Sequence, residues 1–319
     1  MTHNVVVVHE LYPELLAQLQ ADYHVTHFQR LASDEDRQAF REAMRDADAF
    51  IGSNVKFDEA LLDGAPRLKV IASVSVGVDA YPKEAIEARG IVLTNTPEVL
   101  TDATADTGFL LLMMAARRAG EMERKVRSGQ WQASLGRTDF GIDITGKTLG
   151  VVGMGRIGQA VAQRGHHGFN MPVVFYNRSD RPEFEKAFDA RQVSLETLFS
   201  ESDFIVVTVA LSEGTQGLID RKLLAATREK AILINISRGQ VVREEDLISC
   251  LQDGTLYYAG LDVYEREPLA QDSALLALDN AVLLPHIGSS TFETRSAMCD
   301  LAADNLKRVL AGSPALTPA

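Results

Sequence analysis

The feature that most constrains the fold of this chain is a glycine turn near its middle, spaced G-x-G-x-x-G at Gly153, Gly155 and Gly158. An apolar run at residues 149–152 precedes the turn, and a second apolar run at residues 172–176 follows it. This order predicts a buried strand, a tight turn, a helix packed on that strand, and a second strand. The first glycine permits the turn, the second leaves room for a pyrophosphate, and the third lets the helix approach the strand. A glycine turn can be purely structural, but this context favours a dinucleotide site with the phosphates at the helix N-terminus.

The second predicted strand leads into Asn177, Arg178 and Ser179, and these residues bear on the choice between two nicotinamide cofactors. A site for NAD usually carries Asp or Glu here, because a carboxylate accepts hydrogen bonds from the ribose hydroxyls. A guanidinium instead holds a 2′-phosphate through two charge-assisted hydrogen bonds, and Asn and Ser can donate more. We therefore predict a preference for NADP(H), with NAD(H) as a second cofactor. The alternative is that Arg178 is an ordinary solvated loop arginine.

The composition sets bounds on the class of protein. With 319 residues, the chain allows two domains of ordinary size. The net charge of -12 argues against a nucleic-acid partner, for which a basic stripe is expected. Cys250 and Cys299 have no metal-ligand spacing, so we expect no metal, no disulfide framework and a reducing compartment. Residues 109–116, the longest apolar run, are too few for a membrane span, and residues 5–8 are too few for a signal segment. We expect a cytoplasmic protein that does not bind membranes.

Apolar runs alternate with helical patterns in both halves of the chain, which predicts parallel, doubly wound sheets. In the first half we expect strands at residues 5–8, 24–28, 49–52, 70–74 and 91–94, and helices at residues 13–22 and 33–45. A second α/β unit is expected over residues 147–286. Its later strands are predicted at residues 204–211, 231–235, 257–263 and 282–284. One helix is expected to begin at Asp220, and another is expected over residues 244–252.

The segments that connect and follow these units are less regular. We expect one long helix over residues 101–128, joining the two units, and a final helix over residues 290–310. Between them, residues 129–141 lack periodicity and include Trp131. This stretch is either an arm that crosses to another subunit or a surface loop. The tail, residues 313–319, is expected to be loosely held.

Three charged residues follow predicted strands of the second unit: Arg238, Glu267 and His286. In open α/β sheets, ligands bind beyond the carboxyl ends of the strands. Reduction of a carbonyl by hydride needs a proton donor at the carbonyl oxygen, and histidine suits that role near neutral pH. A carboxylate beside the histidine would orient it, and an arginine can hold an α-carboxylate by two parallel hydrogen bonds. Each residue alone has a structural explanation, but together they predict reduction of a 2-oxo acid.

Several stretches resemble the signatures of the D-isomer-specific 2-hydroxyacid dehydrogenases, and the match runs over nearly the whole chain. They are residues 153–158, 235–239, 260–268 and 284–288, which read GMGRIG, NISRG, GLDVYEREP and LPHIG, with residues 73–79 and 100–106 in support. Within the family, GFNMP at residues 168–172 and SGQW at residues 128–131 are similar to the bacterial branch that reduces glyoxylate, hydroxypyruvate and 2-ketogluconate.

The resemblance implies two domains with the active site in the cleft between them. The Rossmann cofactor domain would span residues 99–287, and a discontinuous flavodoxin-like substrate domain would comprise residues 1–98 and 288–319. The family is commonly dimeric, so a homodimer is expected, with the Trp131 arm at the interface.

The resemblance also assigns roles to particular residues. Arg238 would bind the substrate carboxylate and carbonyl, and His286, paired with Glu267, would be the general acid. The backbone N–H groups of Val76 and Gly77 would bind the substrate carboxylate. Further cofactor contacts would come from Thr104, Arg156, Ile157, Asp262 and Gly288.

The chain departs from the family pattern at residues 209–211, where many members have Pro-Leu after His or Leu; this affects one cofactor-lining loop. We therefore predict an NADPH-dependent reductase of small 2-oxo acids, with D-2-hydroxy acids as products. The alternatives are a cofactor-sensing protein like the corepressors of related fold, phosphoglycerate dehydrogenase, and, more remotely, formate or phosphite dehydrogenase.

Overall fold

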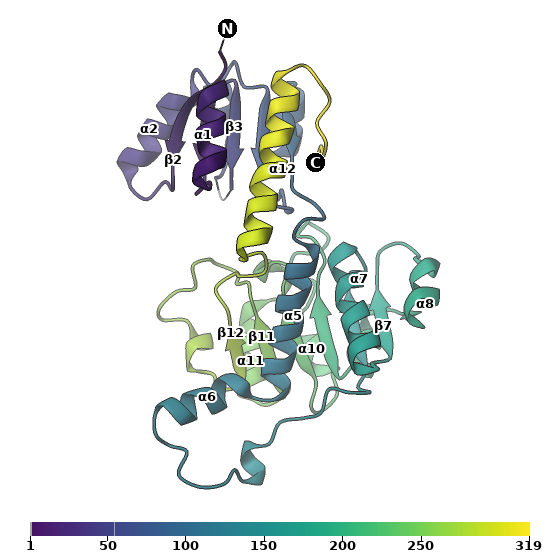
Figure 1. Ribbon diagram of the computed structural model, residues 1–319. Coiled ribbons are helices and arrows are strands. Elements are labelled where there is room, and N and C mark those ends of the chain that lie inside the picture. Colours follow the sequence, from purple (N-terminus) through teal and green to yellow (C-terminus); the bar gives the residue numbers. More distant parts are fainter. Residues whose placement is uncertain (1, 54) are drawn as a thin grey trace. The chain divides into compact units, whose positions relative to one another are not determined.

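The computed structural model describes residues 2–53 and 55–319, which form two compact units (Figure 1). One unit comprises residues 1–100 and 291–319, and the other comprises residues 101–290. Each unit is built around its own parallel sheet, with five strands in the first and seven in the second. The prediction of an α/β protein with two doubly wound parallel sheets is confirmed.

The sheet of the first unit has the strand order β2-β1-β3-β4-β5, which is the flavodoxin-like order. Neighbouring strands are parallel throughout. The strands are β1 (Asn4–Val8), β2 (His24–Phe28), β3 (Ala49–Gly52), β4 (Val70–Ser73) and β5 (Val92–Thr94). Runs of four buried residues in β3 and β4 show why these strands read as continuous apolar segments in the sequence.

The helices of this unit are α1 (Pro13–Asp22), α2 (Asp34–Met44), α3 (Glu59–Asp63), α4 (Lys83–Ala88) and α12 (Phe292–Leu310). Apolar residues of α2, α3 and α4 form one core with Phe50 and Ile71 of the sheet. On the other side, α12 packs along β3, β4 and β5, and Figure 1 shows it in front of the sheet with α1. The final helix begins at Phe292 and not at residue 290, because Thr291 caps it by accepting a hydrogen bond from the N–H of Thr294.

The tail after α12 is held against the first unit, so the expectation of a loose tail is wrong. The buried side chain of Asn305 accepts hydrogen bonds from the N–H groups of Leu316 and Thr317. The Thr317 hydroxyl donates to the carbonyl of Asn95 at 2.6 Å, and the N–H of Ala319 donates to the carbonyl of Leu93. The tail therefore extends the edge of the sheet beside β5.

The sheet of the second unit has the order β12-β11-β10-β9-β6-β7-β8, with all neighbours parallel. Counted from β6, this is the doubly wound order 3-2-1-4-5-6 of dinucleotide-binding folds with one strand added. The strands are β6 (Leu149–Val152), β7 (Val173–Tyr176), β8 (Arg191–Gln192), β9 (Phe204–Val207), β10 (Ile232–Asn235), β11 (Tyr258–Leu261) and β12 (Ala281–Leu283). Several strands are shorter than predicted, since β9 ends at Val207 and β11 ends at Leu261, and polar loops continue from there.

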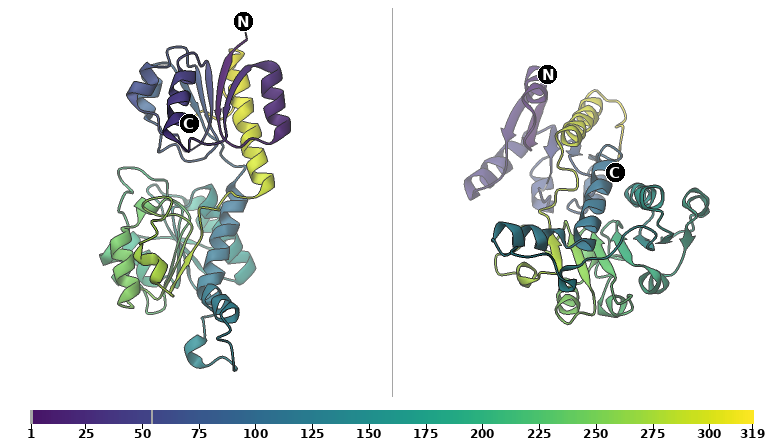
Figure 2. Two further views of the ribbon diagram at one scale, coloured as in Figure 1. Left: turned by 90° about the vertical axis from the view of Figure 1, so that its left-hand side faces the viewer. Right: turned by 60° about the horizontal axis from the view of Figure 1, so that its bottom comes forward.

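Helices cover both faces of this sheet (Figure 2). They are α5 (Thr101–Ala116), α6 (Ala119–Arg127), α7 (Arg156–Gln163), α8 (Pro182–Phe188), α9 (Leu195–Glu201), α10 (Arg221–Ala225) and α11 (Glu244–Gln252). Three short 3₁₀ helices, η1 (Arg137–Asp139), η3 (Gly239–Val241) and η4 (Ala274–Ala277), and one π-helix, η2 (Arg164–Gly168), complete the unit. Residues of α5 and α7 form one core, and residues of α9, α10 and α11 form the other.

The prediction of one long helix over residues 101–128 is wrong, because the structure has two helices there, α5 and α6. Arg118 lies between them in the left-handed conformation, with φ 51°. The N–H of Ile142 donates to the carbonyl of Ala116, and a Cβ on Gly141 would lie 2.2 Å from that carbonyl oxygen. The N–H of Ile142 therefore bonds to the Ala116 carbonyl group, which would accept a hydrogen bond within the helix if α5 continued.

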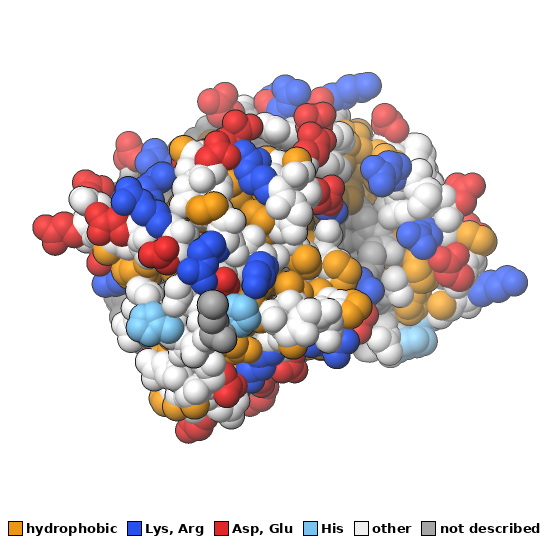
Figure 3. Space-filling model, turned by 90° about the horizontal axis from the view of Figure 1, so that it is seen from above, with side chains coloured by type: hydrophobic (Ala, Val, Ile, Leu, Met, Phe, Trp, Pro, Cys, Tyr) orange, Lys and Arg blue, Asp and Glu red, His pale blue; other side chains and the backbone are white. Residues whose placement is uncertain are grey.

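The surface carries both signs of charge. Figure 3 shows basic and acidic side chains interspersed on the face it presents. None of the described helices is both long and apolar enough to cross a bilayer.

Candidate functional site

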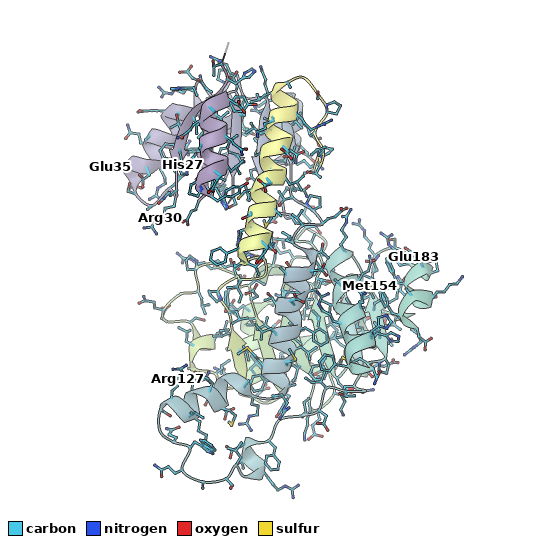
Figure 4. All side chains as sticks on the ribbon, viewed as in Figure 1. His27, Arg30, Glu35, Arg127, Met154 and Glu183 are labelled. Atoms are coloured by element: carbon cyan, nitrogen blue, oxygen red, sulfur yellow. The ribbon has the colours of Figure 1, made fainter. Side chains whose placement is uncertain are left out.

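The glycine turn joins β6 to α7 in the second unit. Gly153 has φ 100°, a conformation that favours glycine, and its carbonyl accepts a hydrogen bond from the Thr208 hydroxyl at 2.6 Å. A Cβ on Gly158 would lie 2.1 Å from the Gly153 carbonyl oxygen, so only glycine permits this approach. A Cβ on Gly155, in contrast, would have no heavy atom within 4 Å. The space beside Gly155 and the helix N-terminus behind it fit the pyrophosphate of a dinucleotide. Met154, between these glycines, is labelled in Figure 4.

The loop after β7 has a defined shape. The Asn177 side-chain amide donates to the carbonyl and the hydroxyl of Ser179, at 3.0 and 3.2 Å. Gln192, from the short strand β8, donates to the carbonyls of both residues at 3.1 Å. Arg178 is exposed at the turn of this loop. No sequence motif marks Gln192, because it supports the loop from a strand of only two residues.

His286 and Glu267 are in direct contact. His286 Nδ1 lies 2.7 Å from Glu267 Oε2, and the other carboxylate oxygen accepts a hydrogen bond from the N–H of Tyr264 at 3.0 Å. Burial alone would raise the pKa of the Glu267 carboxyl. The hydrogen bonds from His286 and Tyr264 and the positive charge of Arg238 outweigh burial, and the pKa is lowered. Glu267 is therefore ionised at neutral pH and can orient His286 and stabilise its protonated form.

The backbone around His286 is fixed by Asp262, which is 1% exposed. Its two carboxylate oxygens accept hydrogen bonds from the N–H groups of Ile287 and Gly288, at 2.7 and 2.8 Å. Burial raises the pKa of the Asp262 carboxyl despite these hydrogen bonds. A Cβ on Gly288 would lie 3.2 Å from the Asp262 carboxylate and 3.4 Å from the Thr104 methyl group, so these three predicted cofactor contacts lie side by side.

Arg238 follows β10 at the start of η3. Its Nη1 donates to the carbonyl of Ser237, and its own carbonyl accepts from the Asn235 side chain at 3.0 Å. A Cβ on Gly239 would lie 1.8 Å from the carbonyl carbon of Tyr264, so the loop that carries Arg238 packs directly on the loop that carries Glu267. The structure thus brings Arg238, Glu267 and His286 to one edge of the second sheet.

The other predicted site residues lie in both units of the chain. Arg156 and Ile157 form the first turn of α7, directly after the glycine turn. Val76 and Gly77 belong to the first unit, in the turn after β4. That turn is held by the Asn95 side chain, which donates to the carbonyl of Val76, and by the Ser75 hydroxyl, which donates to the carbonyl of Gly77. The N–H groups of Val76 and Gly77 have no acceptor among the described residues.

Within residues 2–53 and 55–319, no group of three His, Cys, Asp or Glu side chains is arranged to hold a metal ion. The sheet order, the glycine turn and the charged residues at the strand ends define a dinucleotide-binding oxidoreductase.

Comparisons with known proteins identify the family. The family described as D-isomer specific 2-hydroxyacid dehydrogenase, NAD binding domain, matches residues 109–288. A glyoxylate/hydroxypyruvate reductase B from Yersinia enterocolitica is 44% identical over 313 residues, covering 98% of this chain and 96% of that protein. The chain belongs to the D-isomer-specific 2-hydroxyacid dehydrogenases, which confirms the resemblance and the prediction of an NAD(P)-dependent oxidoreductase.

Solved structures agree with this assignment. A protein of Thermus thermophilus is 39% identical, with a TM-score of 0.90 and 99% of each chain covered. An NADPH-dependent glyoxylate/hydroxypyruvate reductase from Sinorhizobium meliloti, solved with NADP and malonate, is 32% identical, with a TM-score of 0.87 and 100% and 97% of the two chains covered.

Substitution by alanine should have different effects at the last two glycines of the motif, Gly155 and Gly158. In Gly158→Ala the new methyl group meets the Gly153 carbonyl, so we expect a loss of about 1–3 kcal/mol in the free energy of unfolding. Gly155→Ala has open space around the methyl group and should unfold at the wild-type temperature. It should still raise the Kd for the nicotinamide cofactor, because the methyl group would occupy the space that fits the pyrophosphate. Thermal unfolding measures the change in stability, and cofactor titration measures the change in Kd. If the two variants have equal effects on both quantities, the roles assigned to Gly155 and Gly158 are wrong.

Proposed function

We propose that this enzyme reduces glyoxylate, hydroxypyruvate and 2-ketogluconate to D-2-hydroxy acids with NADPH. The observation that carries the proposal is the 2.7 Å contact between His286 and Glu267, beside the loop of Arg238. The named activity of the Yersinia enterocolitica relative supports the first two substrates. We propose the second unit as the cofactor domain and the first unit as the substrate domain.

The chain's own side chains account for the chemistry around the reacting carbonyl. A bound nicotinamide supplies the hydride that reaches the carbonyl carbon. Because Nδ1 of His286 contacts Glu267, its Nε2–H is the group that donates the proton to the carbonyl oxygen, and Glu267 stabilises the protonated imidazole beforehand. Arg238 holds the substrate carboxylate and polarises the carbonyl. The N–H groups of Val76 and Gly77 donate to the same carboxylate.

The cofactor preference depends on the loop after β7. Asn177, Arg178 and Ser179 offer hydrogen-bond donors to a 2′-phosphate, and none of them carries the negative charge that would repel it. Gln192 supports the loop by two hydrogen bonds. The NADP complex of the Sinorhizobium meliloti reductase is consistent with this preference.

We also propose a homodimer, in which a second copy of the chain covers α6 and the segment of residues 129–141. This surface exposes several large apolar side chains among its charged ones, since Trp131 is 60% exposed and Phe140 is 57% exposed. Two hollows of about 430 Å³ each lie along it, lined by Met122, Leu135 and their neighbours. Exposed apolar patches of this kind usually mark protein interfaces.

Because both cysteines are free thiols, we place the enzyme in the cytoplasm.

Oxidation of NADPH, followed by absorbance with each of the three acids, tests the activity. The wild-type enzyme should reduce them, and His286→Gln should lower kcat by about 10²- to 10⁴-fold while leaving the Kd for NADPH within about twofold. The matched control is His167→Gln, an exposed histidine of the same unit, which should keep wild-type kinetics. Full turnover by His286→Gln contradicts its role as proton donor, and a wild-type protein that binds NADPH and reduces none of the acids contradicts the proposed function.

The cofactor preference has its own test. Arg178→Ala should raise the KM for NADPH about 10-fold or more, because a charged hydrogen bond contributes about 1.5–3 kcal/mol, and should leave the KM for NADH almost unchanged. Arg181→Ala is the control, since Arg181 is a nearby exposed arginine that pairs with Glu183. If Arg178→Ala changes both KM values equally, the preference does not come from this side chain.

The dimer is tested by sedimentation. The wild-type protein should have twice the mass of one chain, and Trp131→Glu should shift it toward the monomer by placing a charge in the apolar interface. Leu276→Glu changes a residue of similar exposure, 56%, outside this surface and should remain dimeric. A monomeric wild-type protein, or two variants that behave alike, contradicts the proposed interface.

A further inference from the structure

Two polar side chains that the proposed reaction does not use meet at the carboxyl edge of the first unit's sheet. His9 follows β1 and Ser53 follows β3, and these strands are neighbours. His9 Nδ1 lies 3.1 Å from the Ser53 hydroxyl oxygen.

The local sequence brings these residues together. A Cβ on Gly52 would lie 2.5 Å from the carbonyl oxygen of Val8, so glycine is required for the two strand ends to approach this closely. The backbone at His9 is fixed by a hydrogen bond from its N–H to the carbonyl of Phe28. Its carbonyl contacts Nε2 of His27, which is labelled in Figure 4, at 2.9 Å. The His9–Ser53 pair is thus held on a rigid frame of three strands.

The pair also lies where the topology favours a ligand. In the order β2-β1-β3-β4-β5, the chain leaves β1 toward β2 on one side and continues from β3 on the other. The crevice at the carboxyl ends of β1 and β3 is the switch point of the sheet, and open α/β sheets bind their ligands there.

The chemistry of the pair indicates which ligand group it takes. Burial, the positive charge of Arg295 and the neighbouring His27 lower the pKa of His9 to about 4, so its imidazole is neutral at physiological pH. A neutral imidazole and a serine hydroxyl can each both donate and accept a hydrogen bond. His9 Nε2 has no partner among the described residues. Such a pair matches a ligand hydroxyl, which also donates and accepts.

The spacing of the strands relates this pair to the turn at Val76 and Gly77. That turn follows β4, and β4, β3 and β1 lie in this order across the sheet. Neighbouring strands are about 4.8 Å apart, so Ser53 is roughly one strand spacing, and His9 roughly two, from the turn that we propose for the carboxylate. A two-carbon acid has nothing to reach either side chain. Hydroxypyruvate carries one hydroxyl beyond its carbonyl, and 2-ketogluconate carries a row of them.

We propose that Ser53 and His9 form a subsite for the hydroxyl groups that follow the carbonyl carbon of the substrate, and that they select hydroxylated 2-oxo acids over glyoxylate. This inference rests on the proposed function. Ser53 serves the hydroxyl nearest the carbonyl, and His9 serves those further along the chain.

Steady-state kinetics of Ser53→Ala and His9→Leu with the three acids test the subsite. Ser53→Ala should raise the KM about fivefold or more for hydroxypyruvate and 2-ketogluconate, as expected for one lost neutral hydrogen bond. His9→Leu should do so chiefly for 2-ketogluconate. Both variants should keep kcat and KM for glyoxylate within about twofold of wild type.

Matched variants distinguish the loss of a contact with the substrate from a change in the fold. Ser53→Thr keeps the hydroxyl and should restore most of the wild-type KM. His24→Leu changes an exposed histidine at the opposite edge of the same sheet and should keep wild-type kinetics with every acid. Thermal unfolding identifies a variant that is merely destabilised, and Ser53→Ala, which removes one oxygen, decides the question if His9→Leu does not fold.

The outcomes distinguish the two proposals. A wild-type enzyme that reduces the acids, with variants that change all three KM values equally or none, overturns the subsite alone. A wild-type protein that reduces none of the acids overturns the proposed function, and this inference with it.

Discussion

The geometry of the candidate site depends on one buried carboxylate, that of Asp262. Its two oxygens bind the successive N–H groups of Ile287 and Gly288, directly after His286. His286 itself has φ 54°, in the left-handed region that residues other than glycine rarely adopt. Such a conformation persists only where neighbouring contacts determine it, and here the carboxylate supplies them. The imidazole is then directed by Glu267, whose second oxygen is held by the N–H of Tyr264.

Close packing between loops completes this arrangement. Gly239 lies against the backbone of Tyr264 and Gly158 against that of Gly153, each with no room for a Cβ. The loops that carry Arg238 and Glu267 therefore contact each other through backbone atoms, and the charged groups project from a frame without flexible side chains in between. Precise positioning of this kind is what hydride and proton transfer to one carbonyl group requires.

Much of the fold could be predicted from the sequence, since the parallel strands are short apolar runs bounded by polar turns. The limits of β2, β3 and α1 agree with the prediction to the residue. The break at Arg118 could not be predicted, because the residue in the left-handed conformation is an arginine and its cause, the backbone of residues 141 and 142, lies further along the chain. The ordered tail could not be predicted either, because it is held by the buried side chain of Asn305 and by backbone groups of residues 93 and 95, contacts that only the folded chain creates.

The candidate site could likewise be predicted only in part from the sequence. Arg238, Glu267 and His286 were found because the carboxyl ends of parallel strands meet at one edge. Gln192 and Tyr264 were missed, because each supports the site through a contact that only the folded chain creates.

The division of the chain into units has a consequence for its synthesis. The first unit is made of two separate segments, and α12 packs along β3, β4 and β5 only after residues 101–290 have been made. Domains fold as units while the ribosome elongates the chain. The second unit, whose residues are continuous, can thus complete its sheet while β3, β4 and β5 of the first sheet still lack the helix α12 that packs along them. On the ribosome, the first unit therefore becomes complete only after the second.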